Sequence, residues 1–417
     1  MKLLPLLFCG IFAARAVSAT NPDAATAAIN ELGLDLHRQL ASKNPNLCLS
    51  PLSIQSALVM TFAGAEGQTR EQMAKALHYP ASDSALNDSF AALREELDAV
   101  RKRSAAIATR SKQTGGPSEP IALNLANRLF GEKEYAFRTP FLDLLKDHFQ
   151  APLEPLDFRK NADGSRQRIN AWIEEETKGR IKDLIPQGAL SATTRLVLAN
   201  ALYFKAPWAT EFSEHATKPE PFHIAGTKAE DVPTMINKIK IGYAKLDGFT
   251  ALALPYSGGD LQFLILLPDK PDGLVELESH VTAAELAKGT KLEFQEILLH
   301  LPKFKLTSPS LSLKESLTAL GMKSAFDQPA GSANFDKVAP RQGNEYLYID
   351  DVFHKTFISV DEHGTEAAAA TAVAIAGRAF VRPAEPIEVR VDHPFLYAIQ
   401  DRASGACLFL GRLSDPR

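Results

Sequence analysis

Residues 361–394 constrain the fold of this 417-residue chain more than any other stretch. Here Gly364 is followed by a run of small residues over 365–376, in which Glu366 is the sole charge. Small side chains enter a packed layer without displacing its neighbours, but they contribute little to an ordinary core. We therefore interpret this tract as a segment that changes conformation.

The tract also has the alternation of a strand with two unlike faces. Every second residue from Thr365 onward is small or β-branched, whereas the alternate set begins with Glu366 and is otherwise alanine. Gly364 supplies a hinge, because glycine adopts backbone angles that other residues avoid. Alanine favours helix as well, so a surface helix or a flexible linker also fits the composition. Arg378 stands alone as the fifteenth residue counted from Gly364, and we interpret it as bait for a protease.

The N-terminal residues have the pattern of a secretory signal. Lys2 precedes an apolar run at 3–12, and residues 17–19 (VSA) are small enough for a cleavage point. The run is too short to span a bilayer, although a short anchor remains an alternative. We expect residues 1–19 to be a signal peptide, residues 20–417 to form one domain, and the protein to be secreted and extracellular, or periplasmic in a bacterium.

The charge balance limits the partners. A formal net charge of −4 argues against general nucleic-acid binding, which usually requires a basic excess. Residues 101–120 nevertheless contain five basic residues and end in a Gly-Gly-Pro turn, so we predict a loop there. A polyanion site and a solvated basic loop both fit this stretch. We expect a monomer with neither a membrane nor a nucleic-acid partner.

The cysteines leave two possibilities. Without Cys9 of the expected signal, Cys48 and Cys407 remain, and both lie in apolar runs. Two buried thiols fit this placement, and a disulfide fits an oxidising compartment. Neither residue has His or Cys at metal-ligand spacing, so we expect no metal.

Helices and strands mix without regular alternation, which indicates the α+β class. Helical spacing is clear at 23–40 and at 51–64, where Ser50 is placed to cap the helix and Pro51 occupies its first turn. Residues 195–204 form a nearly continuous apolar run, typical of a strand buried on both faces. Further helices are predicted at 91–103 and 311–321, and further strands at 252–256, 261–268, 297–306, 387–391, 395–399 and 406–413.

Enzyme motifs do not appear in the sequence. It has no GxGxxG, no phosphate-binding Gly-Lys-[Ser/Thr], no HExxH and no GxSxG. His354 lies in a strand-like run, where a histidine is more often structural than catalytic. We expect no catalytic residue and no cofactor.

Several segments, in their order along the chain, resemble the serpins, a family of serine protease inhibitors that act by loop insertion. The similarity extends over residues 25–417. The segments that carry it are 46–54 (NLCLSPLSI), 170–174 (NAWIE) with Thr177 and Ile181, 200–205 (NALYFK) leading to Trp208, 254–256 (LPY) with 266–268 (LLP), and 392–395 (DHPF).

The resemblance implies three sheets surrounded by about eight or nine helices, with an exposed reactive-centre loop at about 362–386. The inhibitory hinge pattern of the family, Glu-x-Gly-Thr-Glu-Ala-Ala-x-Ala-Thr, fits 362–371 throughout. The hinge and insertion residues implied are Glu362, Gly364, Thr365, Glu366, Ala367, Ala369 and Thr371.

The loop length of the family places the reactive bond between Arg378 and Ala379. The partner implied is a serine protease with Arg or Lys specificity, trapped as a covalent 1:1 acyl-enzyme while the cut loop inserts into the central sheet. Phe380 or Arg382 would be the residue that the protease recognises if the loop register differed. A non-inhibitory serpin acting as carrier, chaperone or storage protein is the alternative.

The resemblance also assigns polar residues that control sheet opening. These residues are Ser53, Ser56, Asn200 and His354, with Trp208 at the top, where insertion begins. Ordinary packing is the other interpretation of all five. The resemblance further places Cys48 and Cys407 on strands of one sheet, which keeps the disulfide open.

Overall fold

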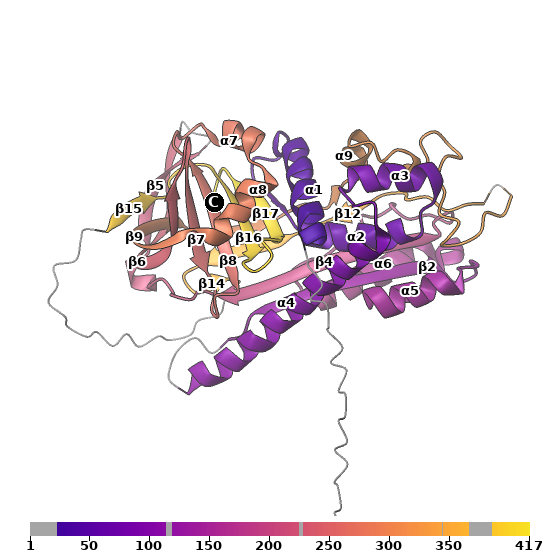
Figure 1. Cartoon of the computed structure of the whole chain (residues 1–417), viewed down its shortest axis with the longest axis horizontal. Helices are drawn as coiled ribbons and strands as arrows, with labels where there is room; N and C mark the ends of the chain where they lie inside the picture. The colour runs from indigo at the N-terminus through magenta and orange to yellow at the C-terminus, as the bar shows by residue number, and fades with distance from the viewer. Residues whose placement is uncertain (1–22, 114–118, 225–227, 344, 367–385) are drawn as a thin grey trace, which may run out of the picture.

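A computed structural model of the protein describes residues 23–113, 119–224, 228–343, 345–366 and 386–417. The expected signal peptide at 1–19 lies outside these ranges. The large sheet lies at one end of the molecule and most of the long helices lie toward the other, so the predicted α+β class is confirmed (Figure 1). The helices of the described ranges are α1 Asp23–Ala41, α2 Pro51–Ala63, α3 Gly67–Ala76, α4 Asp83–Lys112, α5 Thr139–Phe149, α6 Phe158–Glu176, α7 Leu274–His280, α8 Ala283–Lys288 and α9 Lys314–Ala319.

The strands of the described ranges form three sheets, as the resemblance implied. The largest has the order β1-β17-β16-β8-β7-β6-β9-β15, with β5 on β6. Its bounds are β1 Leu47–Leu49, β5 Lys218–Ile224, β6 Lys228–Lys245, β7 Phe249–Pro255, β8 Leu261–Pro268, β9 Glu293–Pro302, β15 Ile387–Arg390, β16 Phe395–Asp401 and β17 Cys407–Leu413.

The second sheet has the order β10-β13-β14-β4-β2-β3, and the third pairs β11 with β12. Their bounds are β2 Ala122–Glu132, β3 Leu153–Leu156, β4 Leu196–Pro207, β10 Phe304–Thr307, β11 Leu311–Ser312, β12 Phe353–His354, β13 Phe357–Asp361 and β14 Gly364–Thr365.

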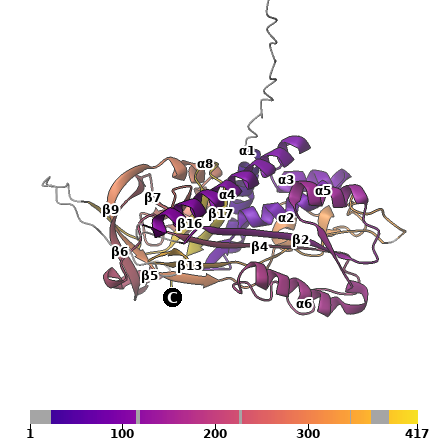
Figure 2. The same ribbon diagram turned by 90° about the horizontal axis from the view of Figure 1, so that it is seen from below.

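The continuous apolar runs become the most buried strands. Every residue of β8, β16 and β17 is buried, and the predicted hairpin of β7 and β8 pairs antiparallel. The six-stranded sheet lies between two helical layers, with α6 on one face and α2 and α4 on the other (Figure 2). Both faces of β4 are therefore covered, which explains why its sequence does not alternate.

The predicted helix starting at Pro51 has the expected ends. The Ser50 side chain accepts a hydrogen bond from the backbone N–H of Ser53, and Gly64 follows the last turn. Side chains are buried around nearly the whole circumference of α2, because it lies beneath the six-stranded sheet and against α1.

Two predicted segments were divided differently. The strand predicted at 297–306 is broken at Lys303, so that β9 belongs to the large sheet and β10 to the six-stranded one. The helix predicted at 311–321 begins instead with the short strand β11 and only then becomes α9. In both cases pairing with a neighbouring strand decides the structure of residues whose local pattern also allowed a different one.

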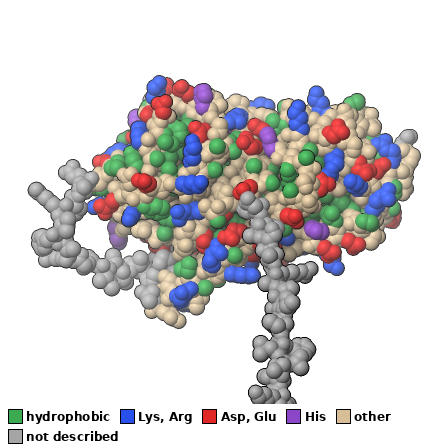
Figure 3. Space-filling model, in the orientation of Figure 1, with side chains coloured by type: hydrophobic (Ala, Val, Ile, Leu, Met, Phe, Trp, Pro, Cys, Tyr) green, Lys and Arg blue, Asp and Glu red, His purple; other side chains and the backbone are tan. Residues whose placement is uncertain are grey.

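The basic stretch is helical through Lys112, so the predicted loop is wrong over that part. The helix α4 is 30 residues long, far beyond the predicted 91–103. Arg103 donates to Asp260 and Glu96, and Arg101 pairs with Asp98 at 3.5 Å. Part of the basic charge is therefore neutralised within the protein, and charges of both signs are interspersed on the face in Figure 3.

The described helices include none with the length and apolar content that a membrane crossing requires.

The disulfide is excluded by strand register. Cys48 of β1 lies opposite Gly411 of β17, and Cys407 is four residues away along that strand, or about 14 Å at 3.4 Å per residue. Bridged cysteines need Cα atoms within about 7 Å of each other. Both thiols are free and buried, and burial raises the pKa of Cys48 to about 11 and that of Cys407 to about 12.

We expect both thiols to resist alkylation in the folded protein at about pH 8, because they are protonated and shielded from solvent. Unfolding without reductant should expose Cys48 and Cys407 together, as counted by mass spectrometry after iodoacetamide treatment. A gain of alkylated sites that appears only after reduction would contradict the free-thiol state.

Candidate functional site at the hinge of the six-stranded sheet

The two-residue strand β14 lies between β13 and β4. On one side Thr365 is opposite Val360 of β13, and on the other it is opposite Ala206 of β4. The backbone N–H of Glu366 continues the ladder by donating to Ser359 O at 2.8 Å. The expected hinge has therefore already begun to pair as a strand of this sheet.

Gly364 is required at this position. Its φ is +154°, and a Cβ added to it would lie 2.1 Å from the carbonyl oxygen of Ala206. The nearby Pro207 Cα would be only 2.8 Å away. No side chain fits so close to the backbone of β4, so glycine sets how closely the hinge approaches the sheet.

Thr365 points inward, as the alternation predicted. Its side chain is buried, and its hydroxyl is 2.5 Å from the hydroxyl of Tyr256. Burial raises the pKa of Tyr256, so this phenol keeps its proton. The Tyr256 ring stacks on Trp208 with centroids 4.8 Å apart, which links the first hinge residue to the expected opening point.

Glu366 lies on the opposite face. Its carboxylate accepts a hydrogen bond from Arg180 Nε at 2.5 Å, and this contact raises the pKa of Arg180. The Arg180 guanidinium also lies over the ring of Phe357, 5.3 Å from its centroid. Because Arg180 follows α6, this ion pair connects the helix that covers the sheet to the hinge.

The residues before Gly364 hold the top of the sheet in place. Trp208 is buried, and its Nε1 donates to Asp361 O at 2.9 Å. Glu362 accepts hydrogen bonds from Lys303 at 2.7 Å and Thr217 at 2.6 Å. Burial alone would raise the pKa of Glu362, but these two contacts hold it below its usual value.

His363 is a site residue that the sequence did not reveal. Its ring nitrogens contact Glu211 Oε2 and Glu214 Oε1, each at 3.0 Å. Partial burial opposes its charge, yet hydrogen bonds to the two carboxylates raise the pKa of His363. These acidic partners lie about 150 positions earlier in the chain, at a distance that no local pattern indicates.

The proposed sheet-opening residues are all buried, but they do not form one hydrogen-bonded set. His354 Nε2 accepts from the backbone N–H of Ser50 at 3.1 Å, and Asn200 donates to Asn127. Ser56 Oγ donates to Leu52 O at 2.7 Å. Ser53 Oγ has no partner within the described residues.

His354 is a neutral group in this environment. Complete burial lowers its pKa to about 4, and its unprotonated nitrogen accepts a backbone hydrogen bond. A protonated ring would lose that acceptor and introduce a charge beneath the sheet.

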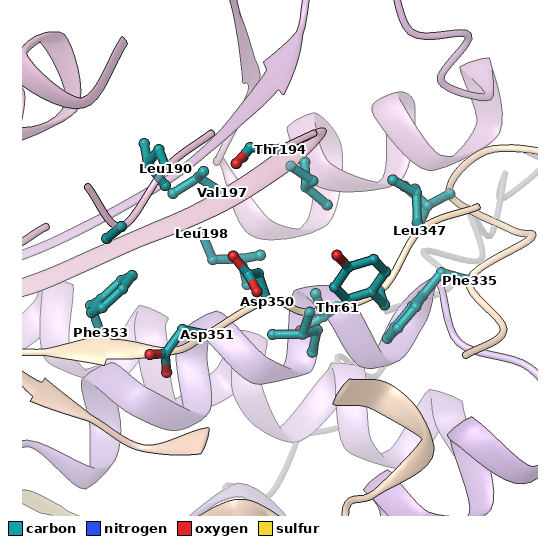
Figure 4. A pocket seen from close by; sticks show the side chains of 15 residues that line it. Thr61, Leu190, Thr194, Val197, Leu198, Phe335, Leu347, Asp350, Asp351 and Phe353 are labelled. Carbon is teal, nitrogen blue, oxygen red and sulfur yellow. The ribbon is translucent and has the colours of Figure 1, made fainter. Parts of the chain in front are cut away.

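A narrow cavity of about 40 Å³ lies beside β4 (Figure 4). Leu196, Val197 and Leu198 of β4 form one wall, and residues 347–351 with Phe353 form the facing wall. Within the described residues, β4 has no ladder partner on the side of β13 other than the two residues of β14. We call the cavity between residues 196–198 of β4 and residues 347–353 the insertion slot.

The remaining expected site residues fall outside the described ranges. They include the reactive bond, its two alternatives and the later hinge positions, namely Arg378, Ala379, Phe380, Arg382, Ala367, Ala369 and Thr371.

We expect the free energy of unfolding to fall as the pH drops through the window between about 6.5 and about 4. There the unfolded chain binds a proton that folded His354 excludes, and a shift of this size corresponds to a loss of about 3 kcal/mol. Urea unfolding at several pH values across that window measures the change in the free energy of unfolding.

The matched variants are His354→Gln, which should flatten this part of the pH dependence, and His215→Gln at an exposed histidine, which should leave it unchanged. Equal pH profiles for both variants would show that His354 is not the titrating group.

Known proteins are similar to this chain over nearly its whole length. Leukocyte elastase inhibitor of Bos taurus is 38% identical over 402 residues, which cover 94% of this chain and 99% of that protein. Serpin B10 of Homo sapiens is 34% identical over 405 residues, covering 94% of this chain and 100% of the relative. The crystal structure of uncleaved ovalbumin superposes with a TM-score of 0.77 at 28% identity, covering 94% of this chain and all of that one.

These comparisons correct the expected location. The prediction that the protein is secreted, extracellular or periplasmic is contradicted by the match of this chain to leukocyte elastase inhibitor and serpin B10.

The family model described as serpin (serine protease inhibitor) matches residues 27–416. Sequence relatives and solved structures match nearly the whole chain, as the family model does. The chain belongs to the serpin family of serine protease inhibitors.

Proposed function

We propose that this serpin inhibits trypsin-like serine proteases, which cut it between Arg378 and Ala379. A protease with an acidic primary pocket accepts Arg378, and its serine forms an acyl-enzyme at the Arg378 carbonyl. The freed segment from Gly364 onward then inserts as a strand and carries the protease with it before deacylation.

The observation that carries this proposal is the position of β14. It runs antiparallel to both of its neighbours, so β13 and β4 run parallel to each other, one strand apart. A longer β14 would give each of them an antiparallel partner, which pairs slightly better than a parallel one. Each added ladder bond contributes about 1 kcal/mol net, so many bonds together would strongly favour insertion.

The register of β14 supports an insertion path that reaches the predicted cluster. Continued without a slip for six residues beyond Thr365, it brings Thr371 opposite Asn200 of β4 and, on the other side, His354 of β12, three residues before β13. The same extension brings Val373 and Ile375 opposite Leu198 and Leu196, which line the insertion slot. Threonine would meet the polar positions, and the larger apolar residues would meet the apolar wall.

The two faces of β14 favour the same path. Thr365 faces the interior beside Tyr256, and the residues that would share this face are alanine, threonine, valine and isoleucine. None of them carries a charge or a long side chain, so burial of this face requires no unpaired charge. Glu366, on the other face, already has Arg180 as its partner.

A second target class follows from the relatives. Several of the matched proteins are named leukocyte elastase inhibitor, and elastase accepts small side chains in its primary pocket. Residues 367–376 and Ala379 offer such side chains, so an elastase-like protease that cuts at one of them is the alternative. A non-inhibitory role would instead leave the cut loop without a trapped protease.

Mixing the protein with trypsin should give a covalent 1:1 complex that survives denaturing electrophoresis, because the acyl bond persists when the loop inserts before deacylation. Sequencing of the released C-terminal fragment should find Ala379 at its start. Arg378→Ala should abolish complex formation with trypsin, whereas Arg382→Ala should retain it.

Cleavage by trypsin without a stable complex would assign the chain to substrates or non-inhibitory serpins. A complex with elastase that persists in Arg378→Ala would favour the second target class.

Thr365→Arg should convert the inhibitor into a substrate that trypsin still cuts at Arg378. The new charge would have to occupy the buried position beside Tyr256 in the inserted strand, and a penalty of about 1.4 kcal/mol on that state already shifts the partition tenfold toward deacylation. The measurement is the number of moles of inhibitor consumed per mole of trypsin inactivated. The control Thr365→Ser keeps the hydroxyl that contacts Tyr256 and should retain a stoichiometry near that of the parent, so equal values for both variants would count against insertion of this face.

A further inference from the structure

The turn between β13 and β14 carries a histidine that joins the hinge to a distant segment. This turn covers residues 361–364, and the backbone N–H of Trp208, just after β4, donates to His363 O at 2.8 Å. The His363 ring adds two contacts to the segment that follows Trp208, one to Glu211 and one to Glu214. We call these two side-chain contacts the hinge clamp.

Different parts of the fold position the two carboxylates of the hinge clamp. The Glu211 side chain is 10% exposed, and its backbone carbonyl accepts from the side-chain amide of Asn237 in β6 at 2.8 Å. Glu214 begins the short 3₁₀ helix Glu214–Ala216, and its side chain is mostly exposed. Because β6 belongs to the large sheet, the hinge clamp connects the hinge of the six-stranded sheet to the large sheet.

Both contacts of the hinge clamp require a protonated ring. A neutral imidazole has one N–H, so its second nitrogen would present a lone pair to the other carboxylate. An imidazolium donates from both nitrogens and forms a charge-assisted hydrogen bond with each carboxylate. Each ring nitrogen of His363 lies 3.0 Å from a carboxylate oxygen, a geometry that only the charged ring satisfies.

The other charged groups of the turn favour the same protonation state. Asp361 accepts from the backbone N–H of His363 at 3.0 Å, and Glu362 has its own cation in Lys303, 2.7 Å away. Partial burial alone would lower the pKa of His363, but the hydrogen bonds to the two clamp glutamates and the charge of Asp361 raise it above its usual value. Loss of the proton would leave three carboxylates around a neutral ring.

The strand β14 has little else to hold it in the sheet. Its ladder covers Gly364 and Thr365, and Glu366 already leaves the strand conformation with a φ of +52°. If this short strand detached, the turn would move away from the segment after β4, and His363 would regain the ordinary proton affinity of a solvated histidine. A proton that binds more tightly to one of two states shifts the equilibrium toward that state, here the paired hinge.

The sign of the pH dependence follows from the raised pKa of His363. The contribution of the hinge clamp is complete below about pH 6.5, the ordinary pKa of histidine, and it is lost as the pH rises through the raised value. The clamp therefore changes state in the range where histidine acts as a switch.

We propose that His363 is a positioning residue that keeps β14 in the six-stranded sheet while its ring is protonated and releases β14 as the ring loses its proton. The consequence for inhibition rests on the proposed function. Insertion of the cut loop extends β14, so it starts most readily from a hinge that is already paired. In mildly acidic solution insertion should therefore compete better with deacylation, and a larger fraction of the protease should be trapped.

The uncut protein tests the hinge clamp without a protease. Hydrogen exchange of a peptide that covers 361–366 reports the pairing of β14, because the backbone N–H of Glu366 donates to Ser359 O. Protection, corrected for the intrinsic exchange rate at each pH, should fall between about pH 6 and about pH 8.5. In a spectrum of the ¹⁵N-histidine-labelled protein, the His363 signal should titrate at a higher pH than the signal of the exposed His215.

Three variants separate the charge of the ring from its shape. His363→Gln should lower the protection of 361–366 at about pH 6 by about fivefold, because a neutral amide forms no charge-assisted contact with the two carboxylates. His363→Arg should keep the protection at every pH, since a guanidinium stays charged and can bridge two carboxylates. His215→Gln, beside Glu214, should follow the parent. Loss of protection in His363→Arg, or an unchanged pH dependence in His363→Gln, would overturn the proposal.

The effect on inhibition is measured as the ratio of cleaved to trapped inhibitor with trypsin. The pH dependence of trypsin itself is common to all variants, so it cancels when each ratio is divided by that of the parent at the same pH. For His363→Arg the quotient should be near one at about pH 6 and about fivefold lower at about pH 8.5.

The exchange and trypsin experiments fail independently. Restored protection in His363→Arg with an unchanged ratio would retain the hinge clamp and refute its effect on inhibition. Absence of a trypsin complex at every pH would refute the proposed function while leaving the exchange result intact.

Discussion

The close approach of Gly364 to the backbone of Ala206 and Pro207 is the contact on which the hinge depends. It lets the chain leave β13, reverse within three residues and enter the sheet beside β4. Any side chain at that position would collide with the carbonyl of Ala206, and the turn would have to open. The strand β14 would then lose its ladder to β4, and with it the register that directs the following residues toward the insertion slot.

Polar contacts of opposite character hold the two faces of the hinge. On the inner face, Thr365 and Tyr256 share a hydrogen bond in a buried site, where burial raises the pKa of Tyr256. On the outer face, Glu366 is paired with Arg180. The proposed insertion along this register would keep both contacts, since the residues that would follow on the inner face carry no charge. The sheet is thus prepared for a longer strand at its top, and it is apolar and narrow further down.

Local sequence pattern predicted several helices and strands, because their ends and their burial depend on nearby residues. The cap and first turn of α2 depend on Ser50 and Pro51 themselves, and the burial of β4 is visible in its unbroken apolar run. The same reasoning failed where a distant strand decided the outcome, as at Lys303, where one predicted strand became two in different sheets. It also failed for α4, where basic residues that resemble a solvated loop continue a helix and find partners such as Asp260.

The sequence by itself determined the family, the α+β class and the hinge pattern, because these depend on residue types in a set order along the chain. Only the tertiary structure decided that β14 is already paired between β13 and β4. It also decided that Cys48 and Cys407 lie too far apart to bond, and that His363 lies between Glu211 and Glu214. Each of these depends on the register of strands that are remote in the sequence, and register follows from the packing of the whole sheet.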